Sequence, residues 1–240
     1  MTQTPHWHMP ANAALHGVAL DQQMALNLTV FASLCVLAQA ILLVSVLLRR
    51  TPQPLAHKRW RLEYLPLTGF AVLFFGLAWH SERLWAAMRY SGADPAAMQV
   101  EAIGMQFAWY FRYPGKDAAF GATDLKFVAP GEGNPAGIDP ADDRGHDDFV
   151  RGALMLPEGR EVDLRLRALD VIHGFNIPAL RVKQNALPGQ VFHIHFTPTV
   201  PGEYSVLCTQ VCGLGHYRMQ AVVRVLPAAE YDAWAREQRP

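Results

Sequence analysis

The sequence predicts two transmembrane helices followed by an all-β domain, and three observations support this prediction. Two long stretches near the N-terminus contain no charge, and alternating apolar residues separated by Pro-Gly turns follow them. Only 18% of the 240 residues are charged, against roughly 25% in an ordinary soluble domain. Basic and acidic residues number 21 each, which excludes a disordered chain of one charge sign and argues against a strongly basic nucleic-acid binder.

The membrane spans are predicted from length and lack of charge. Residues 26–48 and 64–81 contain 23 and 18 uncharged residues, and a helix needs about 20 to cross a bilayer core. Two buried core helices are the alternative, but a soluble domain of this size is not expected to hold both. Positive-inside bias places the linker 49–63 in the cytoplasm, because it carries five basic residues: Arg49, Arg50, Lys58, Arg59 and Arg61. The hairpin 26–90 then leaves residues 1–25 and 91–240 on the outer side.

Residues 91–240 are predicted to form an antiparallel sandwich or barrel of short strands. Apolar residues alternate with polar ones over 162–166 and 191–196. Pro-Gly pairs, which favour turns, recur along the segment. Further strands are expected at 106–113, 151–156, 204–207 and 220–226, and a short surface helix at 228–238.

An acidic loop, residues 131–148, interrupts this pattern. It is rich in turn residues, and residues 116–150 hold eight acidic side chains against three basic ones. A solvated loop is one interpretation. The other is a docking face that steers a basic partner, whose candidate residues are Asp142, Asp143, Asp147 and Asp148.

A cluster of metal-ligand residue types follows, with the spacing Cys-x3-Cys-x3-His-x2-Met from Cys208 and Cys212 to His216 and Met219. Two nearby cysteines in an exported domain can form a disulfide, and the spacing permits one. Thiolate, imidazole and thioether together favour copper, whereas zinc would leave the methionine unused. A single blue-copper site needs only one cysteine, so two cysteines favour a pair of coppers bridged by thiolates, which requires a second histidine.

The second imidazole is expected from His173, which follows the predicted strand 162–166 at a strand edge. His193 and His195 share one face of the next strand, opposite its apolar face, and are not expected to bind metal. Cys35 lies in the first span and is expected to be a packed or lipid-facing thiol.

Three segments together resemble subunit II of the haem-copper cytochrome c oxidases: QFAWYFRYPG (106–115), DVIHGFNIPALRVKQNALPG (170–189) and PGEYSVLCTQVCGLGHYRM (201–219). The resemblance covers most of the chain and implies two spans followed by a cupredoxin-like barrel with a dinuclear copper centre, CuA. It also implies six ligands: terminal imidazoles of His173 and His216, bridging thiolates of Cys208 and Cys212, and weak axial ligation by the Met219 thioether and the Gln210 carbonyl.

Three positions depart from the family pattern. Gln210 stands where many members have a glutamate that helps to bind magnesium, so no magnesium is expected through this side chain. Many members take up electrons through a tryptophan at the position of Phe107, whereas here Trp109 follows on the same predicted strand face, and either residue is a candidate. Asn185 replaces a common aspartate, which implies a weaker polar contact with subunit I.

The function implied by the resemblance is electron transfer in a terminal oxidase of the bacterial inner (cytoplasmic) membrane. This subunit would take electrons from a c-type cytochrome and pass them to haem in subunit I. That partner, alongside other integral membrane subunits, holds the haem and CuB that reduce oxygen, so no catalytic residue is expected in this chain. Glu63 is a candidate proton entrance, with a surface ion pair to Arg59 or Arg61 as the alternative.

Three other functions remain open from the sequence. A CuA subunit of a nitric oxide reductase differs only in its catalytic partner, and a membrane-anchored copper storage or delivery protein would tend to expose Met or His clusters. A quinol-oxidase subunit of the same fold typically lacks the copper ligands, all of which are present here.

Overall fold

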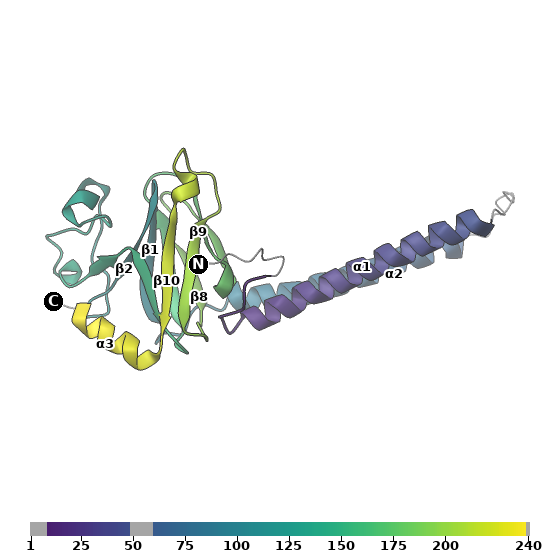
Figure 1. Cartoon of the computed structure of the whole chain (residues 1–240), viewed down its shortest axis with the longest axis horizontal. Helices are drawn as coiled ribbons and strands as arrows, with labels where there is room; N and C mark the ends of the chain where they lie inside the picture. Colours follow the sequence, from purple (N-terminus) through teal and green to yellow (C-terminus); the bar gives the residue numbers. More distant parts are fainter. Residues whose placement is uncertain (1–8, 49–59, 239–240) are drawn as a thin grey trace, which may run out of the picture. The chain divides into compact units, whose positions relative to one another are not determined.

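The computed structural model describes residues 9–48 and 60–238, which form two compact units. One unit is the helical hairpin, residues 19–90, and the other, called here the β unit, joins residues 9–18 to residues 91–238 (Figure 1).

The hairpin consists of α1 (Gly17–Leu48) and α2 (Trp60–Arg89), and both helices are long and apolar enough to cross a membrane. The most apolar 18-residue stretches of the two helices have mean hydropathies of 2.5 and 1.2. No residue in either stretch is buried, as expected for surfaces that face lipid. Both helices extend beyond the predicted spans, because polar residues such as Gln23 and Glu82 continue them past the uncharged stretches.

Glu63 lies in the first turn of α2 and is exposed, so it is not part of a linker as the sequence had suggested. Its predicted ion-pair partner Arg59, like Arg49, Arg50 and Lys58, lies outside the described residues.

A polar contact joins the two helices. The Gln23 amide lies on α1 and donates hydrogen bonds of 3.0 Å to Asn27 Oδ1 and to Ser81 Oγ of α2. Hydrogen bonds of this kind hold membrane helices together where hydrophobic burial gives little driving force.

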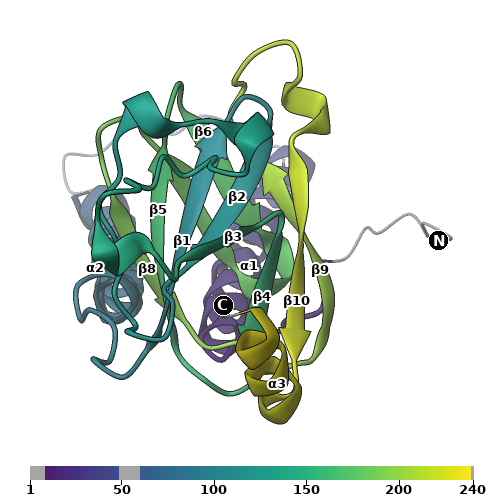
Figure 2. The same ribbon diagram turned by 90° about the vertical axis from the view of Figure 1, so that its left-hand side faces the viewer.

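The β unit contains two five-stranded sheets, seen side by side in Figure 2. The first sheet has the order β3-β2-β1-β5-β8: β3 (Phe149–Arg151), β2 (Ala108–Tyr113), β1 (Met98–Met105), β5 (Val162–Ala168) and β8 (Phe192–Phe196). The second has the order β4-β10-β9-β6-β7: β4 (Ala153–Pro157), β10 (Gln220–Leu226), β9 (Gly202–Cys208), β6 (His173–Ile177) and β7 (Val182–Ala186). The chain ends in α3 (Ala228–Gln238), as predicted.

The all-β prediction is confirmed, but the expectation of a purely antiparallel arrangement is wrong. β1 pairs with β5 in parallel, and β4 pairs with β10 in parallel. Alternation of apolar residues specifies which segments become strands but carries no information on the direction of their pairing.

The core lies between the inner faces of the sheets, where alternate residues such as Phe111, Leu164 and Val223 are fully buried. On β8, Ile194 is buried whereas His193 is exposed, as the alternation had indicated.

A short segment before α1, called here the N-terminal strap (residues 10–16), is part of the β unit. Ala13 and Ala14 are buried in the core, and the Ala13 amide donates a 2.8 Å hydrogen bond to the Ala179 carbonyl. The Ala13 carbonyl accepts from the Thr199 amide at 2.8 Å, and the Leu15 amide donates to the Thr197 carbonyl at 3.0 Å. The strap is thus held to the β unit by backbone hydrogen bonds and one isolated antiparallel bridge, between Ala14 and Pro198, which the sequence did not predict.

The acidic loop is folded by its own carboxylates. The Asp142 side chain accepts hydrogen bonds from the backbone amides of Ala122 (2.6 Å) and Arg144 (3.2 Å), and the Asp147 side chain accepts one from the Lys116 amide. Asp148 forms a fully buried ion pair with Arg112 of β2. Three of the four predicted docking residues therefore hold the loop together, whereas Asp143 is exposed at the surface.

Arg112 lies at the centre of a network of buried charged side chains beneath that loop. It is 1% exposed, lies 3.4 Å from Glu101 on β1 as well as pairing with Asp148, and donates to the Gly121 carbonyl at 2.7 Å. Arg167 of β5 completes the network with a 2.9 Å contact to Glu101. Each charge has an opposite partner, which offsets much of the cost of burying it.

Candidate metal centre

One end of the β unit gathers the predicted ligands from two strands and the loop between β9 and β10. His173 is the first residue of β6, Cys208 is the last residue of β9, and Cys212 lies in the loop. Potential ligand atoms of these three residues all lie within 4.8 Å of one another. No other group of three or more His, Cys, Asp or Glu among the described residues has this spacing.

The two cysteines are free thiols. Their sulfur atoms are 3.9 Å apart, well beyond the roughly 2.0 Å of a disulfide bond, so the structure does not support the disulfide that the spacing had permitted.

The remaining three donors surround the two sulfurs. His216 Nδ1 and Met219 Sδ each lie 3.7 Å from Cys212 Sγ, and the Gln210 carbonyl oxygen lies 3.2 Å from Cys208 Sγ. All six predicted ligand groups therefore meet in one cluster, whereas Glu63 and the acidic-loop residues do not belong to it.

The imidazole of His173 is completely buried, and only one of its nitrogens has a hydrogen-bond partner. Nε2 donates to Asp170 Oδ1 at 2.8 Å, while Nδ1 is buried without a partner. A carboxylate that accepts a hydrogen bond from one ring nitrogen keeps the proton on that nitrogen. The lone pair of the other nitrogen is then free to bind a metal.

Asp170 also accepts from the backbone amides of Gln106 and Val171, both at 2.7 Å. Desolvation raises the pKa of Asp170, but the hydrogen bonds from His173 and these two amides outweigh it, so the pKa is lowered overall. Asp170 was not predicted from the sequence, although its position three residues before His173 was a usable signal.

The backbone clamps the ligand loop at both ends. The Thr209 amide donates to the Gly174 carbonyl at 2.9 Å, and the Cys208 amide donates to the Met219 carbonyl at 3.1 Å. The Gln106 side chain, in the turn between β1 and β2, donates to the Cys212 carbonyl at 2.6 Å.

The six clustered donors all lie in a part of the chain that matches one known protein family. Residues 98–226, just over half of the chain, match the family described as "Cytochrome C oxidase subunit II, periplasmic domain". The chain belongs to the cytochrome c oxidase subunit II family. The resemblance drawn from three sequence segments is thereby confirmed, and the two apolar helices and the β domain of two sheets agree with the fold that it implied.

Relatives in the family include the alternative cytochrome c oxidase subunit 2 of Bradyrhizobium diazoefficiens. It is 40% identical over 145 residues, which are 60% of this chain and 52% of the relative. The cytochrome c oxidase subunit 2 of Synechocystis sp. is 32% identical over 149 residues, 62% of this chain and 35% of that protein. The chain thus spans about half or less of the length of these relatives.

Among solved structures, the periplasmic domain of subunit II of cytochrome oxidase (CoxB) of Bradyrhizobium japonicum aligns with 61% of this chain and 96% of its own. The identity is 23% and the TM-score is 0.45.

The donor set in this subunit II chain fits copper. Desolvation by burial is the main cause that raises the pKa of the Cys212 thiol to about 11, and the neighbouring Cys208 adds to it, since two thiolates this close would repel each other. A cation between the sulfurs removes that repulsion, and soft sulfur with imidazole nitrogen is the combination that copper prefers. The unpartnered Nδ1 of His173 supplies a lone pair ready for the same ion.

The two candidate aromatic residues do not share a strand face, so that expectation is wrong. β2 begins at Ala108, which leaves Phe107 in the preceding turn, 39% exposed, against Gly213 and Gly215 of the ligand loop. A Cβ at Gly215 would lie 2.4 Å from the Phe107 ring, so only glycine permits this contact. Trp109 points into the core instead and is 2% exposed.

Exposed apolar side chains surround the site. Leu214 is 97% exposed, and Val211 and Tyr217, on the same ligand loop, are also largely exposed. Apolar surface of this kind marks a protein-interaction site.

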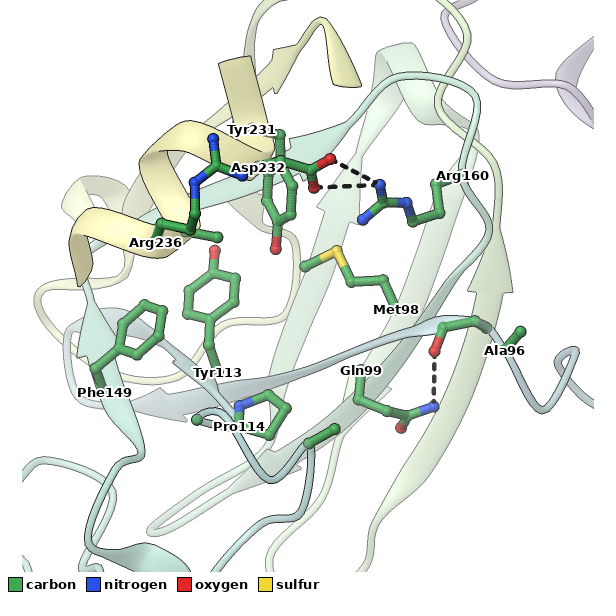
Figure 3. Close-up of a pocket in the computed structure, with 14 residues that line it drawn as sticks. Ala96, Met98, Gln99, Tyr113, Pro114, Phe149, Arg160, Tyr231, Asp232 and Arg236 are labelled. Atoms are coloured by element: carbon green, nitrogen blue, oxygen red, sulfur yellow. Dashed lines mark hydrogen bonds and ion pairs between the residues drawn. The ribbon is translucent and has the colours of Figure 1, made fainter. Parts of the chain in front are cut away.

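A separate cavity of about 460 Å³ lies at the other end of β1, against α3 (Figure 3). Met98, Tyr113 and Tyr231 contribute to its wall, and Arg160 pairs with Asp232 at 3.2 Å across its rim. None of the six clustered donors lines this cavity, so it is distinct from the metal centre.

Proposed function

We propose that this chain is the electron-transfer subunit of a terminal oxidase and holds two copper ions in a dinuclear CuA centre. The observation that carries the proposal is the convergence of two free thiols, two imidazoles, a thioether and a backbone carbonyl in one cluster. Copper bound there supplies one-electron redox chemistry. The family match favours this function over a nitric oxide reductase subunit or a copper storage or delivery protein.

The residues of the chain have distinct tasks in this proposal. Cys208 and Cys212 would hold both metals through their thiolates, His173 and His216 would each supply an imidazole, and Met219 and the Gln210 carbonyl would be the weaker donors. Asp170 keeps the proton on His173 Nε2, so that Nδ1 remains a ligand. The loop is clamped to β6 and to the β1–β2 turn, so its donor atoms are held in place, which would favour fast electron transfer through bound copper.

The partners that we propose are a c-type cytochrome, subunit I and other integral membrane subunits of the oxidase. The exposed surface of Phe107, Val211, Leu214 and Tyr217 is the best-supported contact for the cytochrome. Phe107 is our choice for the residue through which electrons enter, because it is exposed and contacts the ligand loop, whereas Trp109 is buried. Haem and CuB belong to subunit I, which reduces oxygen.

The proposed location is the inner membrane of a bacterium. If α1 and α2 both span the bilayer, the strap and the rest of the β unit lie on the same side, and the basic linker assigns that side to the exterior. Exposed Glu63 at the start of α2 remains our candidate proton entrance.

Two polar side chains near the site differ from the family pattern and lie at the surface. We propose that no magnesium binds through the Gln210 side chain, since an amide is a poor ligand for a hard cation. Asn185, exposed on β7, is proposed to make a weaker contact with subunit I than an aspartate would.

Copper binding tests the function directly. Full-length protein, purified in detergent without metal and then supplied with copper, is expected to bind two coppers per chain, as measured by elemental analysis. An intense purple colour and an EPR signal from one electron shared equally by two nuclei should accompany them. A blue spectrum with one copper per chain, or preferential uptake of zinc, would contradict the proposal.

Cytochrome docking is expected to depend on the exposed acids of the loop rather than on its buried ones. Replacing Glu132 and Asp143 with Gln and Asn should slow cytochrome oxidation by the assembled oxidase about 2- to 10-fold at low salt and much less at high salt. The matched control neutralises Glu230 and Glu237 on α3. Equal slowing by the control, or no dependence on salt, would show that the loop does not steer the cytochrome.

A further inference from the structure

A buried indole contacts one ligand of the metal centre without being a ligand itself. Trp109 lies on β2, and its ring centroid is 5.8 Å from that of His173 at an interplanar angle of 67°, an edge-to-face contact. The ring of Phe175 packs against the same indole at 5.1 Å and 76°. The indole is therefore held between the ligand and the core.

The contact depends on a glycine in the neighbouring strand. Gly104 of β1 is paired directly with Trp109, and a Cβ at this position would lie 2.9 Å from the Trp109 ring and 3.0 Å from Cδ2 of His173. Glycine weakens a strand interior, and its presence there often marks a close approach of other groups. Here it leaves the space in which the indole and the imidazole meet.

Packing alone does not explain a tryptophan at this position. Its indole N–H is buried and has no hydrogen-bond partner, which costs free energy that a phenylalanine or leucine would avoid.

The restraints on His173 are complementary. The hydrogen bond from Nε2 to Asp170 Oδ1 fixes one atom of the imidazole ring. It still permits the ring to rotate about the axis of that hydrogen bond. The edge-to-face contact with Trp109 opposes that turn, because the indole occupies the space beside the imidazole. Together the two contacts fix the direction in which the Nδ1 lone pair points.

We propose that Trp109 is a positioning residue that sets the orientation of the His173 imidazole, with Gly104 providing the space for it. The inference rests on the proposed function only in naming copper as the ion that His173 binds. It assigns Trp109 a role inside the site, separate from the passage of electrons through the exposed Phe107.

Three variants of the full-length protein test this role through copper affinity, measured by competition with a chelator. Trp109→Leu is expected to weaken copper binding about 10- to 100-fold and to change the nitrogen hyperfine coupling of one imidazole. Trp109→Phe, which keeps an aromatic ring, should restore most of the affinity. Phe111→Leu is the matched control, because Phe111 is equally buried on the same strand, and it should leave the affinity within about twofold.

A second pair of variants tests the glycine. Gly104→Ala is expected to weaken copper binding as Trp109→Leu does, whereas Gly152→Ala should not, since a Cβ there meets no atom within 4 Å. Unchanged affinity in both Trp109→Leu and Gly104→Ala, or an equal loss in Phe111→Leu, would overturn the proposal.

Nitrogen NMR of histidine-labelled, metal-free protein separates failure of this inference from failure of the proposed function. In the wild type, the His173 ring should give one sharp Nε2–H signal, and in Trp109→Leu this signal should broaden through ring motion. If the wild type binds no copper pair but the broadening occurs, the proposed function fails and the positioning role survives. If the signal is unchanged in Trp109→Leu, the positioning role is wrong whatever metal is bound.

Discussion

Replacing Cys212 with Ser is expected to abolish the EPR signal of an electron shared between two coppers and to leave at most one copper per chain. Cys212 is the most central donor: its sulfur is 3.9 Å from that of Cys208 and 3.7 Å from both His216 Nδ1 and Met219 Sδ. A serine hydroxyl is a hard donor that stays protonated, so it cannot replace a bridging thiolate. EPR and elemental analysis of the full-length variant measure both outcomes.

Cys35→Ser is the matched control for that experiment. Cys35 is a free cysteine on α1, exposed within the helical hairpin, and its replacement should leave the copper count and the EPR signal unchanged. A shared-electron signal that persists in Cys212→Ser would show that Cys212 does not bridge the metals.

Replacing Arg112 with Met is expected to destabilise the β unit by about 3–5 kcal/mol, because it leaves buried carboxylates without their positive partner. Arg112 pairs with both Glu101 and Asp148. Burial raises the pKa of Asp148 although Arg112 opposes that rise, so loss of the guanidinium should raise this pKa further. A carboxyl whose folded-state pKa is raised favours the folded protein more as the pH falls, and acid should therefore restore part of the lost stability.

Denaturant unfolding at several pH values measures this effect. The control is Arg224→Met, which removes one partner of an ion pair with Glu203 whose side chains are about half exposed, and which should cost less than about 1 kcal/mol. A similarly small loss of unfolding free energy in Arg112→Met, or a loss of unfolding free energy that grows as the pH falls, would contradict the expected role of the buried network.

Several elements follow from local sequence patterns alone. β10 and α3 match their predicted ranges, and β5 and β8 lie close to theirs, because alternation or helical spacing is clear in each. β1 was missed because both of its faces are buried, one of them carrying Glu101, so the segment lacks the expected alternation of apolar and polar residues. Only the distant partners Arg112 and Arg167 make a carboxylate acceptable there.

The ligand set was predictable to a similar extent. Cys208, Cys212, His216 and Met219 are close in sequence, so their residue types and spacing limit the chemistry. Trp109 was noticed as an aromatic residue but expected on the same strand face as Phe107, and its contact with His173 was not predictable because it joins two sheets that the sequence does not relate. Asp148 was placed in a docking face because charge density in a sequence cannot distinguish an exposed carboxylate from one paired beneath the surface.

The N-terminal strap has a consequence for biogenesis. Its bonds from Ala13 and Leu15 reach Ala179, Thr197 and Thr199, so a segment that precedes both helices in the chain binds residues that follow both of them. Insertion of only one helix in a membrane would leave the strap and the residues that it binds on opposite sides of the bilayer, unable to meet. The β unit with its strap in place can therefore form only when both helices cross the bilayer or neither does.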